Sequence, residues 1–270
     1  MQKRPTSRGM LLFFIMISAA ALGNGLSDSV YANYFKEAYN VTTQQRAFIE
    51  FPRELPGLLC ALVIAALSML GDAKTSLIAQ VAACAGLMAL GLFTPSYGVM
   101  LIFLFINSMG MHLFMPLSDS MGMALAEPGQ VGRRMGQYAS VKMFFGFVAG
   151  IAVFFGFRFG LFSFHTPIKL PFIIGAGFFA IAGIAAALLV KQNIHTLCRQ
   201  KSPRLVFRKQ YRYYYLLTML NGVQKQIAYV FGSWVIIDLL LKRADTMSLL
   251  MITASFVSIF FMRAIGRWID

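Results

Sequence analysis

Charged residues are scarce in this sequence. Asp, Glu, Lys and Arg together make up 13% of its 270 residues, whereas soluble domains contain about 25% on average. Hydrophobic residues make up 58% of the chain and stand in long runs. This composition excludes an ordinary soluble domain and indicates a membrane protein.

Cysteine is rare too. The three cysteines, Cys60, Cys84 and Cys198, have no spacing that predicts a disulfide or a metal site. The sequence also lacks a Gly-rich phosphate loop, a cluster of metal ligands and a nucleophile with a neighbouring base. We therefore expect no cofactor, no metal and no enzymatic activity, and the lack of a nucleotide-binding motif disfavours an ATP-driven pump.

Windows of about 20 apolar residues, the length that crosses a bilayer, predict eight membrane-spanning helices. The first is expected to be an uncleaved span rather than a signal peptide, because its apolar run continues through Leu22 without a cleavage site. The fold class is therefore all-α, a polytopic membrane protein. The predicted spans are residues 9–36, 44–70, 75–94, 97–124, 135–158, 170–192, 211–240 and 246–266.

The basic residues predict the orientation. A net charge of +14 would suggest nucleic-acid binding in a soluble protein, but here Lys and Arg gather on one side of the predicted spans. A cytoplasmic N-terminus places most of them inside, so we expect a multi-pass protein of the cytoplasmic membrane that binds no nucleic acid. The few basic residues expected on the outer side are Lys36, Arg46, Arg158, Lys169, Lys242 and Arg243.

The chain contains a short internal repeat. Asn24-Gly25-Leu-Ser-Asp28 in the first span matches Asn221-Gly222-Val-Gln-Lys225 in the seventh, 197 residues later. Asp72 after the second span and Asp270 after the eighth are 198 residues apart. Two landmarks with nearly equal offsets predict two related halves. The predicted domains are an N-terminal six-helix bundle (1–192), a basic cytoplasmic linker (193–210) and the first two helices of a second bundle (211–270).

Six spans, a long basic loop and a further set of spans resemble the major facilitator superfamily, whose members have two bundles of six helices. The family's loop motif follows the second and the eighth helix. Gly266-Arg-Trp-Ile-Asp270 keeps its glycine-to-aspartate spacing, and Asp72-Ala-Lys74 keeps the aspartate and a lysine. Gly132-Arg133-Arg134-Met-Gly136 is similar to the family's loop between helices four and five. The resemblance implies a gating role for Asp72 and Asp270, and a full chain of about 400 residues of which eight helices are present here.

Polar residues in the first span share a helical face. Asn24, Asp28 and Tyr31 are four and then three residues apart, which places them on one side of a helix. The resemblance places this face and the seventh span on a central cavity. The candidate substrate contacts on these two spans are Asn24, Asp28, Tyr31, Asn221, Gln224 and Lys225.

The repeat makes Lys225 equivalent to Asp28, so the two are expected to face each other between the halves. A proton or a charged substrate can break such an ion pair in a low dielectric, which makes Asp28 a candidate for proton coupling. The alternative is a permanent ion pair that holds the halves together.

The second span concentrates charge near two prolines. Glu50, Arg53 and Glu54 lie on one side of a helix, since they are three and four residues apart. One arginine cannot neutralise two carboxylates, so we expect one glutamate to hold a proton and the three residues to act in proton coupling. Pro52 and Pro56 are expected to bend the helix and free carbonyl oxygens. An ion-paired kink that only packs against its neighbours is the alternative.

The fourth span carries His112 near its middle. An imidazole there could bind substrate or carry a proton, because its unperturbed pKa is about 6.5; a packing histidine is the alternative. Asp119 and Lys142 lie roughly 12 Å from the inner ends of the fourth and fifth spans at 1.5 Å per residue. We expect them to form a structural or gating pair.

Together these residues favour a secondary active transporter that moves a small polar solute by alternating access, with protons as the coupling ion. Its expected partners are the solute, protons and the lipid bilayer, and we expect a monomer. A complete eight-span channel or sensor is one alternative. An intramembrane enzyme that uses His112 and Asp119 is another.

Overall fold

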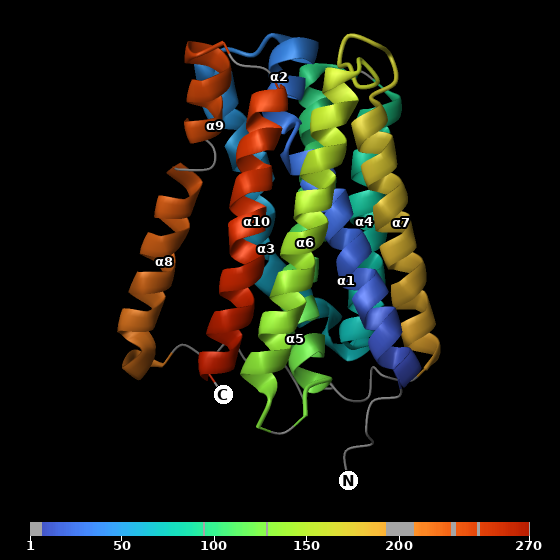
Figure 1. Cartoon of the computed structure of the whole chain (residues 1–270), viewed down its shortest axis with the longest axis vertical. Coiled ribbons are helices and arrows are strands. Elements are labelled where there is room, and N and C mark those ends of the chain that lie inside the picture. The colour runs from blue at the N-terminus through green and yellow to red at the C-terminus, as the bar shows by residue number, and fades with distance from the viewer. Residues whose placement is uncertain are drawn as a thin grey trace.

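The computed structural model is helical in the part of the chain that it describes, with no strand there (Figure 1). Among the described residues, six helices are long and apolar enough to cross a membrane, which confirms the all-α class and fits a multi-pass membrane protein. These six are Arg8–Asp28, Thr43–Leu70, Asp72–Leu92, Tyr97–Ala124, Val131–Arg158 and Leu170–Lys191. The described residues are 7–93, 95–127, 129–192, 208–227, 231–241 and 244–269.

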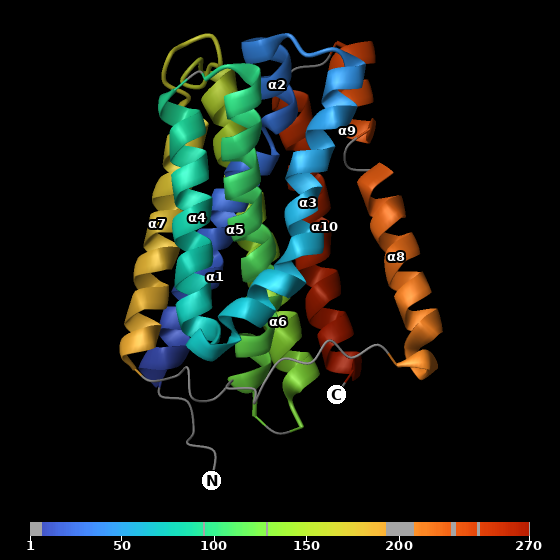
Figure 2. The same ribbon diagram turned by 180° about the vertical axis from the view of Figure 1, so that it is seen from behind.

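The helices form an elongated bundle (Figures 1 and 2). The long ones are α1 (Ser7–Asp28), α3 (Thr43–Leu67), α4 (Asp72–Leu92), α5 (Tyr97–Ala124), α6 (Val131–Arg158), α7 (Leu170–Lys191) and α10 (Ala244–Ile269). The short ones are α2 (Tyr31–Tyr39), η1 (Ser68–Leu70), η3 (Lys209–Tyr211), α8 (Arg212–Gln226), α9 (Gly232–Trp234) and η5 (Val235–Leu239). The predicted seventh and eighth spans correspond to α8, α9 with η5, and α10, which are not among the six membrane candidates.

The predicted first span is two helices rather than one. α1 ends at Asp28 and α2 begins at Tyr31. Ser29 Oγ donates to the carbonyl oxygen of Gly25 at 2.6 Å, and Ser27 bonds back to its own helix in the same way. Such serine side chains compete with backbone N–H groups for helix carbonyls, so they favour a break here. The expected single face is therefore interrupted, with Asp28 exposed and Tyr31 buried.

α3 begins with a capping box. Thr42 Oγ1 accepts from the Gln45 N–H, and the Gln45 side-chain oxygen accepts from the Thr42 N–H. Pro52 and Pro56 lie inside the helix, where each removes a backbone donor. α3 packs on α5 and crosses it obliquely in Figure 2.

The centre of the bundle depends on close helix crossings. α1 packs against α6 and α7, and α4 packs against α5 and α7. A Cβ on Gly110 of α5 would lie 2.3 Å from the carbonyl oxygen of Ala79, and one on Gly86 of α4 would lie 2.5 Å from the Asn107 nitrogen. Glycine at both positions therefore lets α4 and α5 approach to backbone contact.

Among the described residues from 208 onward, α10 and the α9–η5 segment contact the earlier helices. α10 packs along α6, where Ser140 Oγ donates to the Ile259 carbonyl oxygen at 3.2 Å and the rings of Phe147 and Phe256 are 6.0 Å apart. Side chains of α9 and η5 contact α2 and the start of α3. α8 lies at the edge of the molecule in both views, and most of its described side chains are exposed.

Candidate functional site

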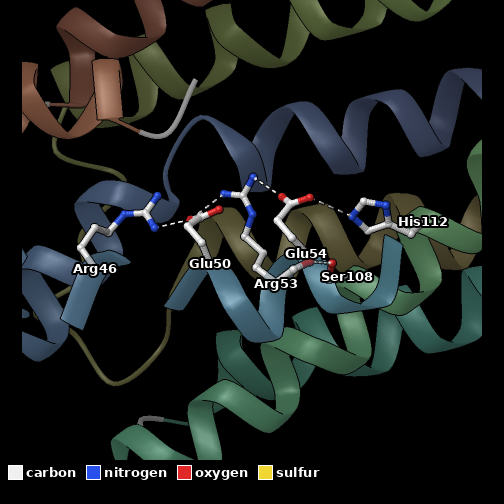
Figure 3. Close-up of polar contacts among 6 residues, drawn as sticks. All are labelled: Arg46, Glu50, Arg53, Glu54, Ser108 and His112. Carbon is white, nitrogen blue, oxygen red and sulfur yellow. Dashed lines mark hydrogen bonds and ion pairs between the residues drawn. The ribbon is translucent and has the colours of Figure 1, made fainter. Parts of the chain in front are cut away.

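Charged side chains follow one another along α3 and continue onto α5 (Figure 3). Arg46 Nη1 bonds to Glu50 Oε1, and Arg53 Nη1 lies 3.5 Å from the same oxygen. Arg53 Nη2 lies 3.3 Å from Glu54 Oε1. His112 Nε2 of α5 lies 3.7 Å from Glu54 Oε2. We call Arg46, Glu50, Arg53, Glu54 and His112 the charged row.

The charged row extends deep into the predicted span. Glu50 and Glu54 are 7 and 11 residues after Thr43, which at 1.5 Å per residue is about 10 Å and about 16 Å along the helix. His112 lies near the middle of α5. Ionisable groups at this depth are costly unless they are paired, and each of the two glutamates has an arginine partner.

The structure places a second arginine, Arg46, beside the two glutamates. From the sequence, Arg46 is expected on the outer side, which leaves Arg53 as the only cation beside two glutamates. In the structure Arg46 lies in the first turn of α3 with its side chain 4% exposed, and it binds Glu50, which is 12% exposed. Two arginines therefore accompany the two glutamates. His112 adds an imidazole to the row, a group whose unperturbed form takes up a proton near neutral pH.

Two side chains of α5 contact the proline-containing part of α3 (Figure 3). Ser108 Oγ donates to the carbonyl oxygen of Arg53, close to the two prolines. The His112 ring lies against Gly57, where a Cβ would come within 3.1 Å of Nδ1. The glycine thus leaves room for His112 to reach Glu54.

Asp28 approaches the charged row from α1. Its side chain is exposed and interacts electrostatically with Arg53. Asn24, one turn earlier, has a buried Oδ1 without a hydrogen-bond partner in the described residues, which fits a substrate contact. Tyr31 is instead buried in the bundle and donates to Asn107 Oδ1 at 2.7 Å. Its position fits a packing residue better than a substrate contact.

Three of the four predicted gating positions, Asp72, Asp119 and Lys142, connect α5 to its neighbours. Lys142 Nζ of α6 lies 3.2 Å from Asp119 Oδ1, so these two residues form the expected pair. Asp72, in the first turn of α4, accepts a hydrogen bond from Ser120 Oγ at 2.6 Å. Asp270 lies outside the described residues.

The predicted contacts on α8 are only partly described. Asn221 and Gln224 are exposed on this helix at the edge of the molecule (Figure 2). The side chain of Lys225 lies outside what the structure describes. The pairing of Asp28 with Lys225 therefore stays a prediction.

A second polar cluster, at the α2 end of the bundle, has no counterpart among the predicted sites. Lys36 Nζ of α2 lies 2.7 Å from Asp238 Oδ1 of η5. Trp234 Nε1 donates to Thr43 Oγ1 at 3.4 Å. The sequence offers no signal for the pairing of Lys36 with Asp238, because 202 residues separate them. It does offer one for the pairing of Arg46 with Glu50, since Arg46 precedes Glu50 by one helical turn.

Within the described residues, no group of three or more His, Cys, Asp or Glu side chains is arranged to hold a metal ion. The charged row therefore offers paired charges and a titratable imidazole rather than a ligand set. No family model matches the chain, and no curated protein matches it.

Proposed function

We propose that the protein is a secondary active transporter of the major facilitator type. It moves a small polar solute across the cytoplasmic membrane by alternating access, with its N-terminus in the cytoplasm and protons as the coupling ion. The observation that carries the proposal is the charged row, because ionisable side chains at membrane depth typically mark a substrate or proton path.

The contact between His112 and Glu54 supports proton coupling. The two groups are 3.7 Å apart, and neither is fully buried, with side chains 26% and 38% exposed. A proton on the imidazole would be held by the carboxylate, and its release would leave Glu54 paired with Arg53 alone. One proton therefore changes the charge pairing between α3 and α5.

The unequal ends of the molecule support alternating access. At the α2 end, the Lys36–Asp238 ion pair joins α2 to η5. Toward the other end, α8 lies at the edge of the bundle (Figure 1). A carrier needs two arrangements in which opposite ends are closed in turn, and the ion pair at the α2 end is consistent with the arrangement that is closed there.

The polar groups near the charged row support a polar solute. Asn24 offers a buried carbonyl oxygen without a partner in the described residues, and an acceptor in that state gains from a ligand that donates a hydrogen bond. The row itself offers both signs of charge. We propose a solute that carries hydrogen-bond donors, transported by a monomer in the lipid bilayer.

Uptake by the full-length protein in proteoliposomes tests the proposal. Sugars, nucleosides, amino acids and organic acids are screened with and without an imposed pH gradient, beside Glu54→Gln and the matched carboxylate variant Glu127→Gln in the α5–α6 loop. Saturable uptake that is driven by the gradient, lost in Glu54→Gln and kept in Glu127→Gln supports the proposal. Flux that does not saturate and ignores both substitutions indicates a channel and overturns it.

A further inference from the structure

Trp234 is buried among residues of the first helices. It belongs to the short α9, is 3% exposed, and shares an apolar cluster with Phe35, Val41 and Ile49. Its Nε1 donates to Thr43 Oγ1 at 3.4 Å. An aromatic side chain from the last part of the chain thus fills a position between α2 and the start of α3.

Asp238 adds an ionic contact one turn further along η5. Lys36 Nζ donates to its Oδ1 at 2.7 Å, and Thr43 Oγ1 donates to its Oδ2 at 3.4 Å. The segment that carries these contacts is a π-helix, a wide and uncommon form that recurs at functional sites. We call Lys36, Thr43, Arg46, Trp234 and Asp238 the Trp234 contact.

Arg46 belongs both to this contact and to the charged row. Its guanidinium carbon lies 6.0 Å from the ring centroid of Trp234 and 5.4 Å from that of Phe35, while Nη1 bonds to Glu50. The residue is 3% exposed, and its Nε is buried without a hydrogen-bond partner in the described part of the chain. Glu50 therefore holds a buried cation against the face of Trp234.

We propose that the Trp234 contact closes the α2 end of the bundle and that Arg46 makes this closure depend on the charge of Glu50. Neutralising Glu50 leaves the buried guanidinium without its carboxylate, which is strongly unfavourable. Arg46 then moves toward solvent and withdraws both its cation–π contact and its aliphatic stem from Trp234. The closure loosens as a result.

Several other charged groups surround the Arg46–Glu50 pair and affect how strongly it holds. Glu50 faces Arg46 and Arg53 on its own helix, and Asp28 of α1 interacts with Arg53. On the α2 side, Lys36 lies 5.8 Å from the Trp234 ring centroid and is paired with Asp238. A proton or a solute charge that displaces Arg53 or Arg46 from Glu50 would open the α2 end. This consequence rests on the proposed transport function, but the closure can be tested without transport.

The chain contains two tryptophans, so Trp268→Phe leaves Trp234 as its single fluorophore of this type. In that background, in lipid nanodiscs, we expect blue-shifted emission and little quenching by acrylamide. Asp238→Asn and Glu50→Gln are each expected to shift the emission to the red and to raise the quenching constant several-fold. Glu127→Gln removes an exposed carboxylate in the α5–α6 loop, outside the charged row and the Trp234 contact, and is the matched control, with no expected change.

A charge exchange separates loosening from unfolding. Lys36→Asp alone should raise the quenching, and Lys36→Asp combined with Asp238→Lys should restore the background value, which an unfolded chain would not do. Strong quenching already in the background overturns the closure. A response to Asp238→Asn together with none to Glu50→Gln overturns the link through Arg46. None of these outcomes depends on whether the protein transports a solute.

Discussion

Arg46 and Glu50 form an ion pair across one turn of α3, with only 4% and 12% of their side chains exposed. The pair connects the charged row with the Trp234 contact, since Glu50 also lies next to Arg53 in the row and Arg46 also contacts Trp234. A buried pair is far more sensitive to the loss of one partner than a surface pair. We therefore expect a large loss of stability when Arg46 is replaced.

Arg46→Met should destabilise the protein by about 3–5 kcal/mol, because it keeps much of the side-chain volume but leaves Glu50 without its nearest cation. The measurement is the free energy of unfolding in mixed micelles. Arg158→Met, at the exposed end of α6, is the matched control and should stay within about 0.5 kcal/mol of the parent protein. Equal effects of the two substitutions would show that the buried pair contributes no more than a surface arginine.

Gly110→Ala should destabilise the crossing of α4 and α5. The new Cβ would lie 2.3 Å from the Ala79 carbonyl oxygen and 2.4 Å from the Ala83 nitrogen, and overpacking of this kind costs about 1–3 kcal/mol or more. Gly98→Ala in the first turn of α5 meets nothing within 4 Å and should be neutral or stabilising by up to about 1 kcal/mol. Thermal unfolding in detergent distinguishes them, and an unchanged Gly110→Ala melting temperature contradicts the close crossing.

Much of the fold can be predicted from the apolar runs alone. The span predicted at 97–124 coincides with α5, because a long apolar segment in lipid has to satisfy its backbone as a helix. The break after Asp28 could not be predicted in this way. It depends on hydroxyl groups of Ser27 and Ser29 that bond to nearby carbonyls, and hydropathy does not register such bonds.

The candidate site could be predicted only where partners are close in sequence or at equal depth. Glu50 and Arg53 follow from helical spacing, and Asp119 and Lys142 follow from their similar distance to the helix ends. The pairing of Arg46 with Glu50 was missed because Arg46 lies at the start of the predicted span and was counted with the outer basic residues rather than with the two glutamates. The docking of η5 on α2 depends on tertiary packing between distant segments, which no local pattern encodes.

Asn107→Ala should loosen three helices at once. Asn107 accepts from the Tyr31 hydroxyl at 2.7 Å and donates through Nδ2 to the Ala83 carbonyl oxygen at 2.8 Å, and it is 1% exposed. Truncation leaves two buried polar groups unpaired, so we expect a loss of about 1–3 kcal/mol or more in the free energy of unfolding. Asn221→Ala on the exposed surface of α8 is the matched control. A loss no larger than that of the control contradicts the proposed bridging role.

If protons drive transport, replacing His112 should remove the dependence of transport on pH. Replacing the imidazole with a neutral amide in His112→Gln keeps a polar side chain near Glu54 but removes the imidazole, the side-chain type whose unperturbed pKa lies near neutral pH. When the imidazole binds a proton, Glu54 stabilises the resulting positive charge. A pH gradient can drive transport through this binding and release of a proton. The variant should therefore lose the dependence on pH while keeping the ability to bind solute.

The expected result is that His112→Gln, in the full-length protein, lowers solute accumulation to the level reached without a pH gradient, whereas exchange of labelled for unlabelled solute continues. His165→Gln is the matched control, because His165 is 75% exposed and lies 3.8 Å from Glu37 outside the charged row. It should leave both measurements unchanged. If His112→Gln accumulates solute as the parent protein does, the proton is carried elsewhere, whereas loss of exchange as well would place His112 in solute binding instead.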